Sequence, residues 1–380
     1  MKTTHPVLVV LGLFLAACSN ATATTITPPP TQPATSNAVL PTEKLTPTAP
    51  SPTATASQTP EPTLEPLPAL HVITTDNARE VVALRTLQIP DFRMSSVSQC
   101  SLSFSPDGSL LAGVCDYSTA PVWEVESGRL RYTLLIEASH EVAVAFNPQG
   151  DVLAIGGFSG EIRLFDPSSG KEVKNLAKLP SQIWDLNFNP SGDQLAAATF
   201  STGVFVTTLA RGELLWSHGE QGHMGVLSTD YSPDGSSLAF GRISSGIMVM
   251  EATTGETIAE TLIPVPVGDV RYSPDGRWLA TASDDNKIRL WNTTDYSLEQ
   301  TLVGHTNFVN GVVFNPDGSL LVSGGHDRKV GIWDVQNGEA LKFLEGHQNA
   351  VLRVAINPEG TLIASISWDG TVRLWGVIEK

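Results

Sequence analysis

The feature that most constrains the fold is a short phrase, Phe-Asn-Pro-Asp-Gly at residues 314–318, which recurs along the chain. The other copies keep an aromatic or aliphatic first residue, the proline and the glycine. They begin at Phe104, Phe146, Phe188, Tyr231, Tyr272 and Ile356. Successive copies start 42, 42, 43, 41, 42 and 42 residues apart. Seven copies at so regular a period indicate a repeat architecture built from one supersecondary unit.

The chemistry of the phrase predicts a tight turn. Proline fixes φ near −65°, which suits the second position of a type I turn, and aspartate is tolerated at the third. Glycine supplies the positive φ that closes a three-residue hairpin with a bulge. Alternating apolar runs flank the phrase, as at residues 309–314 and 320–323. The chain therefore reads as seven hairpins, and because helical patterns are nearly absent we expect an all-β class.

The sixth unit shows the content of one repeat. Its four expected strands are residues 309–314, 320–323, 329–333 and 340–344. Gly-His at 304–305 precedes the first strand, and Trp-Asp at 333–334 closes the third. Four strands in about 42 residues with these two marks resemble the WD40-repeat family of β-propellers. The resemblance covers about residues 80–380 and implies a single seven-bladed β-propeller, WD40-like, with its binding face where the loops before the first and after the second strands gather.

The resemblance varies along the chain. The third strands of units five to seven match the WD40 pattern closely, and those of units one and two match it in part. Units three and four, at residues 204–207 and 247–250, are the least similar. The turn phrase nevertheless sets seven blades. The last unit lacks a fourth strand before Lys380, so the resemblance implies that residues 80–87 complete it by "velcro" closure, which protects exposed strand edges.

The amino-terminal segment predicts export. Residues 1–17 form a lipoprotein signal peptide, with Lys2 before an apolar run at 7–16 that is too short to span a bilayer comfortably. The run ends Leu-Ala-Ala before Cys18, which resembles the lipobox of bacterial lipoproteins, where the cysteine thiol is acylated. An ordinary signal peptide cleaved near Ala17 is the alternative. We expect a lipid-anchored, extracytoplasmic protein of the bacterial cell envelope.

Two further parts follow the signal peptide. Residues 18–70 are rich in threonine and proline and poor in large apolar residues, so they cannot bury enough surface to order themselves. They predict a disordered stalk that holds the folded part away from the membrane. Residues 71–380 are the propeller. The net charge of −16 and the pI near 4.8 argue against nucleic acid and against anionic membrane surfaces as partners.

One constellation imitates a hydrolytic triad and occurs twice at the same spacing. The two sets are His305, Ser323, Asp327 and Trp333, and His347, Ser365, Asp369 and Trp375. In the family that the chain resembles, the matching residues form a structural hydrogen-bond network. Two copies favour that interpretation, because an enzyme rarely needs one site twice. Unit five keeps Thr281, Asp285 and Trp291 but has Ile263 in place of the histidine, so its network is incomplete.

We therefore expect no catalytic residue, no cofactor and no metal site. No Cys/His cluster has zinc spacing, and Asp285 belongs to the loop set above rather than to a calcium site. Cys100 and Cys115 mirror each other across the first turn phrase. In an extracytoplasmic setting they are either a disulfide or two small buried residues on opposite faces.

Function is expected at the loop face. The alignment assigns to it His140, Trp184, Leu227, Phe308, His326 and Trp368. Exposed aromatic side chains there would anchor a protein or peptide partner. In the alternative, Trp184 and Phe308 pack between blades, and Trp368 in its loop is the best single candidate. The sequence thus predicts a monomeric, non-catalytic scaffold. A carbohydrate- or envelope-polymer-binding propeller is the first alternative, and a propeller hydrolase or lyase the second.

Overall fold

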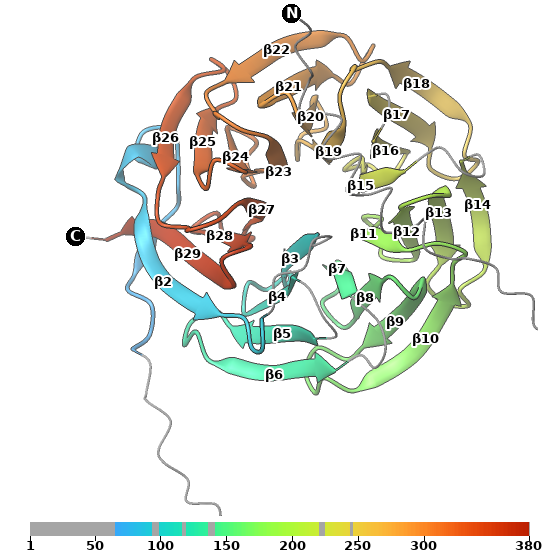
Figure 1. Ribbon diagram of the computed structural model, residues 1–380, viewed down its shortest axis with the longest axis horizontal. Helices are drawn as coiled ribbons and strands as arrows, with labels where there is room; N and C mark the ends of the chain where they lie inside the picture. The colour runs from blue at the N-terminus through green and yellow to red at the C-terminus, as the bar shows by residue number, and fades with distance from the viewer. Residues whose placement is uncertain are drawn as a thin grey trace, which may run out of the picture. The chain divides into compact units, whose positions relative to one another are not determined.

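The computed structural model describes residues 65–92, 99–115, 119–135, 141–219, 225–243 and 246–379. Its strands form seven antiparallel sheets arranged as blades around a central axis (Figure 1). The predicted class and blade number are confirmed: the described chain is a seven-bladed β-propeller. The signal peptide at 1–17, Cys18 and the stalk as far as residue 64 lie outside the described residues.

In each blade the strands follow one another from the axis outward, and hydrogen bonds join consecutive strands. The first three blades contain β3 (Cys100–Phe104), β4 (Leu110–Cys115), β5 (Thr119–Glu124) and β6 (Leu130–Leu135), then β7 (Glu141–Phe146), β8 (Leu153–Gly157), β9 (Glu161–Phe165) and β10 (Glu172–Lys178), then β11 (Ile183–Phe188), β12 (Gln194–Thr199), β13 (Gly203–Thr208) and β14 (Leu214–His218).

The next three blades repeat this order. Their strands are β15 (Val226–Tyr231), β16 (Ser237–Arg242), β17 (Gly246–Glu251) and β18 (Thr257–Thr261), then β19 (Val267–Tyr272), β20 (Trp278–Ser283), β21 (Lys287–Asn292) and β22 (Leu298–Val303), then β23 (Val309–Phe314), β24 (Leu320–Gly325), β25 (Val330–Asp334) and β26 (Ala340–Leu344).

The seventh blade closes the ring with strands from both ends of the described chain. It contains β27 (Val351–Ile356), β28 (Leu362–Ser367) and β29 (Thr371–Ile378), and β2 (Val82–Gln88) pairs with β29 as its outer strand. The predicted velcro closure is therefore confirmed. The closing strand begins at Val82 rather than at residue 80, because residues Ala78–Glu80 form a 3-10 turn. A short strand, β1 (Leu70–His71), also pairs with the end of β29.

The turn phrase behaves as its chemistry predicts. Gly318 has φ 74° and donates its N–H to the Asn315 carbonyl, while Asn315 in turn donates to the Leu320 carbonyl. The Asp317 carboxylate accepts the N–H of Ser319, which fixes the turn from its side chain. The phrase also joins blades, because a Cβ at Gly360 would lie 3.3 Å from the Cδ atom of Pro316 in the preceding turn. The seven turns thus gather at one end of the central axis.

The hydrophobic core lies between blades rather than within one central mass. Each interface between adjacent blades holds one apolar cluster. Between blades one and two, for example, Leu110 and Val122 of blade one pack with Val144 and Leu153 of blade two. The second strands are buried on both faces, and every residue of β4 and β24 is buried. A blade therefore depends on both of its neighbours for burial, which makes the closed ring the stable unit.

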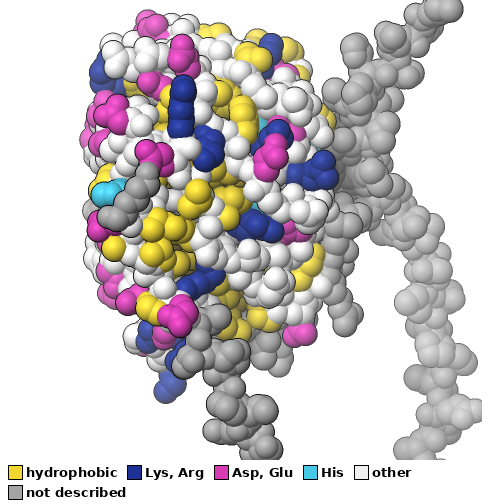
Figure 2. All heavy atoms as spheres, turned by 90° about the vertical axis from the view of Figure 1, so that its left-hand side faces the viewer, with side chains coloured by type: hydrophobic (Ala, Val, Ile, Leu, Met, Phe, Trp, Pro, Cys, Tyr) yellow, Lys and Arg dark blue, Asp and Glu magenta, His cyan; other side chains and the backbone are white. Residues whose placement is uncertain are grey.

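Most of the exposed large apolar side chains lie on the outer strands. Near the seam, Val72 after β1, Val82 on β2 and Ile378 at the end of β29 are 50%, 43% and 43% exposed. Figure 2 faces the side of the ring where the seam lies and shows hydrophobic side chains mixed with charges of both signs. Among the described residues, no helix has the length and hydrophobicity that a membrane span requires.

Candidate interaction surface

The end of the propeller opposite the turn phrases presents one equivalent position from each of several blades. The position follows the second strand directly, and its residues are Phe158, Phe200, Ile243, Asp284, His326 and Trp368, hereafter the top ring. All six are neither fully buried nor fully exposed. Aromatic or branched aliphatic side chains occupy four of the six, so the top ring is an apolar surface with two titratable members.

A repeated backbone hydrogen bond positions the top ring. The N–H of His326 donates to the carbonyl of Phe308, which directly precedes the innermost strand of the same blade, at 2.8 Å. The N–H of Trp368 donates in the same way to Ala350 at 3.0 Å. The matching pairs in blades three to five are Phe200 to Gln182, Ile243 to Gly225 and Asp284 to Pro266. Five of the six top-ring residues are therefore held beside the innermost strand of their own blade.

Three of the predicted anchor residues meet across blades six and seven. The ring centroids of Phe308 and His326 lie 5.5 Å apart, and those of His326 and Trp368 lie 5.2 Å apart. Burial lowers the pKa of His326, and nearby Asp327 only partly opposes this effect. A neutral imidazole between two aromatic rings gives a flat, weakly polar contact surface, which is the kind of surface that protein interfaces use as an anchor.

Two other predicted anchors, Trp184 and Leu227, do not join this surface. Trp184 is 2% exposed and stacks on Phe200 with centroids 4.9 Å apart, so its prediction as an exposed anchor is wrong. The reason is its place inside β11, where it packs beneath the loop instead of in it. Leu227 lies within β15 and is half-buried, and His140 falls outside the described residues.

Sequence reasoning missed Phe158, Phe200, Ile243 and Asp284. Together with His326 and Trp368, these residues recur along the sequence at the same interval as the turn phrase. The repeat itself would therefore have located them. Asp284 is the acidic member of the top ring. Burial, followed by repulsion from Asp285, raises the pKa of Asp284 to about 6. Its charge therefore changes near neutral pH, within the top ring.

The two triad-like sets lie directly behind the top ring. The Nδ1 atom of His305 is 2.9 Å from the Asp327 carboxylate, and its Nε2 atom is 2.7 Å from Ser323 Oγ. The indole N–H of Trp333 donates to the same Oγ at 2.7 Å. Since a carboxylate only accepts, Nδ1 donates to Asp327 and the serine hydroxyl donates to Nε2.

The second set repeats this geometry. His347 lies 2.8 Å from both the Asp369 carboxylate and Ser365 Oγ, and Trp375 donates to Ser365 Oγ at 2.9 Å. Both serines are 0% exposed, so no substrate can reach either hydroxyl. The chemistry available to these sets is positioning, and they position the loops of the top ring.

The carboxylates connect these networks to the ring. Asp327 directly follows His326 and accepts the N–H of Thr306 at 3.0 Å, while Asp369 directly follows Trp368 and accepts that of Gln348 at 2.8 Å. Burial acts to raise the pKa of Asp369, but the bonds from His347, Thr371 and Gln348 outweigh it and hold the pKa low. A charged, fully bonded carboxylate therefore fixes each loop at the residue after its aromatic side chain.

Blade five keeps only part of this arrangement. Trp291 donates its indole N–H to Thr281 Oγ1 at 3.1 Å. Asp285, with no histidine to contact, forms an ion pair with Arg289 instead. Ile263 occupies the histidine position and is 2% exposed. The incomplete network predicted from the sequence is what the side chains show, with an arginine as the substitute partner.

The two cysteines of the first blade form a buried cross-link between neighbouring strands. Cys100 lies directly opposite Cys115 in the β3–β4 ladder, with Cα atoms 4.2 Å apart, and the structure joins the two sulfur atoms. Neither cysteine is accessible, since they are 1% and 0% exposed. Among the described residues, no three His, Cys, Asp or Glu side chains are grouped so that they could hold a metal ion.

Fold and surface together define a β-propeller whose loop face presents an apolar ring. Comparison with known families adds to this description. The family model "WD domain, G-beta repeat" matches four segments, at residues 129–166, 263–292, 296–334 and 338–376. The chain thus contains four recognisable WD40 repeats, which supports its placement in a WD40 family. WD40 propellers are typically protein-interaction scaffolds.

Two curated fungal proteins are similar to part of the chain. Both are called nuclear distribution protein PAC1, one from Arthroderma benhamiae and one from Trichophyton verrucosum. Each is 26% identical over 214 residues, which is 55% of this chain and 39% of the relative. The chain therefore spans about two fifths of the length of the curated relatives that it matches.

Proposed function

We propose that this protein is a non-catalytic scaffold that binds protein or peptide partners through the top ring. The observation that carries the proposal is the composition of that ring. Six equivalent loop positions meet at one end of the propeller, and four of them, Phe158, Phe200, Ile243 and Trp368, are apolar and partly exposed. Large, rigid side chains held by backbone bonds form the low-entropy contact surface that interface anchors require.

The setting of this scaffold is also a proposal. A lipid on Cys18 would hold the chain at the bacterial cell envelope, and the threonine- and proline-rich segment after it would act as a spacer. Support comes from the lipobox-like sequence before Cys18 alone. Incorporation of radiolabelled palmitate into the wild type, and its loss in Cys18→Ser, would test the anchor. Equal incorporation into both chains would contradict it.

Peptide selection tests the binding role. Peptides would be selected from a display library against the purified chain, and their Kd values measured for wild type, Trp368→Ala and Phe200→Ala. We expect each substitution to weaken binding by at least tenfold, since anchor residues contribute about 2 kcal/mol or more. The matched controls are Val173→Ala on β10 and Ile258→Ala on β18, which remove exposed apolar side chains from outer strands and should change Kd by less than twofold.

The competing functions give different results in the same assays. Binding to a glycan array that requires Trp368, without any peptide binding, would replace the proposal with a carbohydrate-binding role. Peptide binding that the outer-strand controls weaken as much as the top-ring variants do would move the site to another face. Turnover of any hydrolase substrate that Ser323→Ala abolishes would contradict the non-catalytic assignment.

A further inference from the structure

Asp284 is the acidic member of the top ring, and its carboxylate has no partner. Its backbone N–H donates to the carbonyl of Pro266 at 3.1 Å. The loop that contains Pro266, residues 262–266, has the sequence Leu-Ile-Pro-Val-Pro and offers no polar side chain. In the part of the chain that the structure describes, no hydrogen bond or ion pair reaches the Asp284 carboxylate. A half-buried carboxylate is thus held against an apolar loop within the top ring.

The neighbouring charged groups do not compensate Asp284. Asp285, the next residue, pairs with Arg289, whose Nη1 atom lies 3.1 Å from its carboxylate, so this arginine is already used. His326, in the adjacent blade, stays neutral because burial lowers its pKa. Burial and then Asp285 raise the pKa of Asp284, and no described cation or donor opposes this rise. The ionised carboxylate is therefore costly in the free protein, and a cation that reaches it is stabilising.

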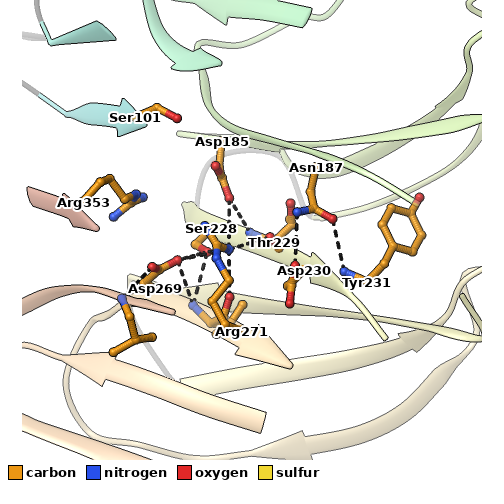
Figure 3. Close-up of polar contacts among 12 residues, drawn as sticks. Ser101, Asp185, Asn187, Ser228, Thr229, Asp230, Tyr231, Asp269, Arg271 and Arg353 are labelled. Atoms are coloured by element: carbon orange, nitrogen blue, oxygen red, sulfur yellow. Dashed lines mark hydrogen bonds and ion pairs between the residues drawn. The ribbon is translucent and has the colours of Figure 1, made fainter. Parts of the chain in front are cut away.

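Asp185 and Asp269, on the innermost strands β11 and β19, show how the same protein compensates other buried carboxylates. The Nη1 atom of Arg271 lies 3.2 Å from the Asp269 carboxylate and 3.8 Å from that of Asp185 (Figure 3). The positive charge of Arg353 also acts on Asp185, so the charges of this wall balance. At Asp284 no described residue supplies such a cation, and the carboxylate is open to one from outside.

The surroundings of Asp284 define the kind of cation that fits. Leu262, in the loop that holds Asp284, is 75% exposed. The top-ring position of the preceding blade is Ile243, and the following blade presents Phe308 at the start of its innermost strand. A lysine side chain carries its ammonium group on an apolar stem, which such side chains can cover. A bare inorganic cation would gain nothing from these apolar neighbours.

We propose that the top ring binds a segment of a partner protein in which a basic side chain stands between apolar side chains, and that Asp284 pairs with the basic group. This inference rests on the proposed function, because it names the partner chemistry of the same surface. The apolar side chains of the segment would contact Phe200 and Trp368. The formal net charge of −16 also favours the approach of a basic partner.

Three synthetic peptide pools test the proposal at pH 8, where the Asp284 carboxylate is charged. Each pool has a central residue flanked on both sides by two positions drawn from leucine, isoleucine, phenylalanine and tryptophan, followed by a polyethylene glycol spacer and a fluorophore. The central residue is lysine, norleucine or glutamate. Fluorescence anisotropy with the full chain measures Kd. We expect the lysine pool to bind about tenfold more tightly than the norleucine pool, which keeps the stem without the charge, and the glutamate pool to bind most weakly.

Variants of one residue locate the effect. Asp284→Asn should reduce the affinity for the lysine pool to that for the norleucine pool, and it removes no hydrogen bond, so the fold should be unaffected. Asp284→Lys should make the glutamate pool the tightest binder. The matched control is Asp295→Asn, because Asp295 is an exposed carboxylate of the same blade, in the turn between β21 and β22. This turn lies beside the turn phrase, since Thr293 donates to the Gly276 carbonyl, and the control should keep the lysine preference.

The outcomes separate this inference from the proposed function. Equal affinity of the wild type for the lysine and norleucine pools would overturn the inference, and so would a lysine preference that survives in Asp284→Asn or Asp284→Lys. If such equal binding is still lost in Trp368→Ala, the peptide-binding role stands and only the partner chemistry is wrong. A preference that Asp295→Asn removes as fully as Asp284→Asn would assign it to the overall charge and would also overturn the inference. No binding of any pool would contradict both proposals.

Discussion

Blades four and six solve the same packing problem with different chemistry. In blade six, Ser323 on the second strand and Trp333 on the third are joined by a hydrogen bond and completed by His305. In blade four the equivalent positions hold Phe240 and Met250, both 0% exposed. Each blade nevertheless forms the same four-stranded sheet. The polar network is therefore one way of filling this space rather than a condition for forming a blade.

The difference lies in what each solution fixes. Strand pairing and the clusters between blades fix the sheet, and an apolar pair serves them as well as a polar network does. The network additionally reaches the loop, because Asp327 holds the backbone of Thr306 beside the top ring. Blade four lacks the serine and the tryptophan, and instead pairs its buried Arg242 with Glu260 at 2.7 Å. Polar networks thus specify loop geometry, and apolar packing specifies the blade.

Removing the large side chain should produce the biggest effect in both blades. Trp333→Ala deletes a side chain that is 1% exposed and leaves Ser323 without its donor, so we expect a loss of about 4 kcal/mol in the free energy of unfolding. Met250→Ala should cost about 3 kcal/mol. Urea unfolding of both variants measures the difference. A cost below 1 kcal/mol for Met250→Ala would show that blade four is not packed as an equivalent of blade six.

Breaking the network at its histidine should cost somewhat less. His305→Leu keeps the volume but removes the hydrogen bond that the Asp327 carboxylate accepts from the imidazole. The Asp327 side chain is 4% exposed, so water replaces that bond poorly. We expect a loss of about 3 kcal/mol and faster hydrogen exchange at Thr306. The control is Ile263→Val in blade five, which should cost about 1 kcal/mol because no carboxylate depends on Ile263. Equal costs would mean that the network adds nothing beyond packing.

The pH dependence of stability should run in opposite directions in blade four and in the network of blade seven, which repeats that of blade six. Burial is the main cause that raises the pKa of Asp230 in blade four to about 7. Its contribution to stability is thus present below about pH 4 and is lost as the pH rises through about 7. Asp369 has a lowered pKa, so its contribution is present above about pH 4 and is lost as the pH falls below that value.

Two substitutions separate these contributions. Because Asp230 keeps partial access to solvent, we expect Asp230→Asn to reduce the loss of stability between pH 5.5 and 8 by about 1 kcal/mol, less than the full shift implies. Asp369→Asn should instead flatten the profile below pH 4. Urea midpoints across this range provide the measurement. Identical profiles for wild type and Asp230→Asn would contradict a titration at this residue.

The smallest effect is expected in blade five, where the network is partial. Thr281→Val removes the hydroxyl oxygen that accepts the Trp291 indole N–H, and we expect a cost of about 1 kcal/mol. Ser323→Ala in blade six breaks contacts to both His305 and Trp333 and should cost about 2 kcal/mol. Thermal unfolding by calorimetry compares the pair. A larger cost for Thr281→Val would reverse the expected order of the two blades.

Much of the fold could be predicted because its determinants are local and periodic. Pro316 and Gly318 specify the same turn wherever the phrase occurs, and the seam follows from a missing outer strand. The network residues were also recognisable, since two copies at one spacing mark a shared role. Trp184 was misplaced because an aromatic residue near a strand boundary can lie in the loop or in the strand, and only side-chain packing against Phe200 decides between them.

By itself, the sequence determined the number of blades, their strands and the two complete networks. Their determinants lie within single repeats and recur about every 42 residues. Only the tertiary structure decided which side chains meet between repeats. Asp185 and Arg353 each stand three residues before the first residue of a turn phrase, and Arg271 stands one residue before its own, so the repeat places all three on innermost strands without showing which charges meet. Ring closure brings them to one channel, and charge pairing across the axis depends on distances that the order of residues does not contain.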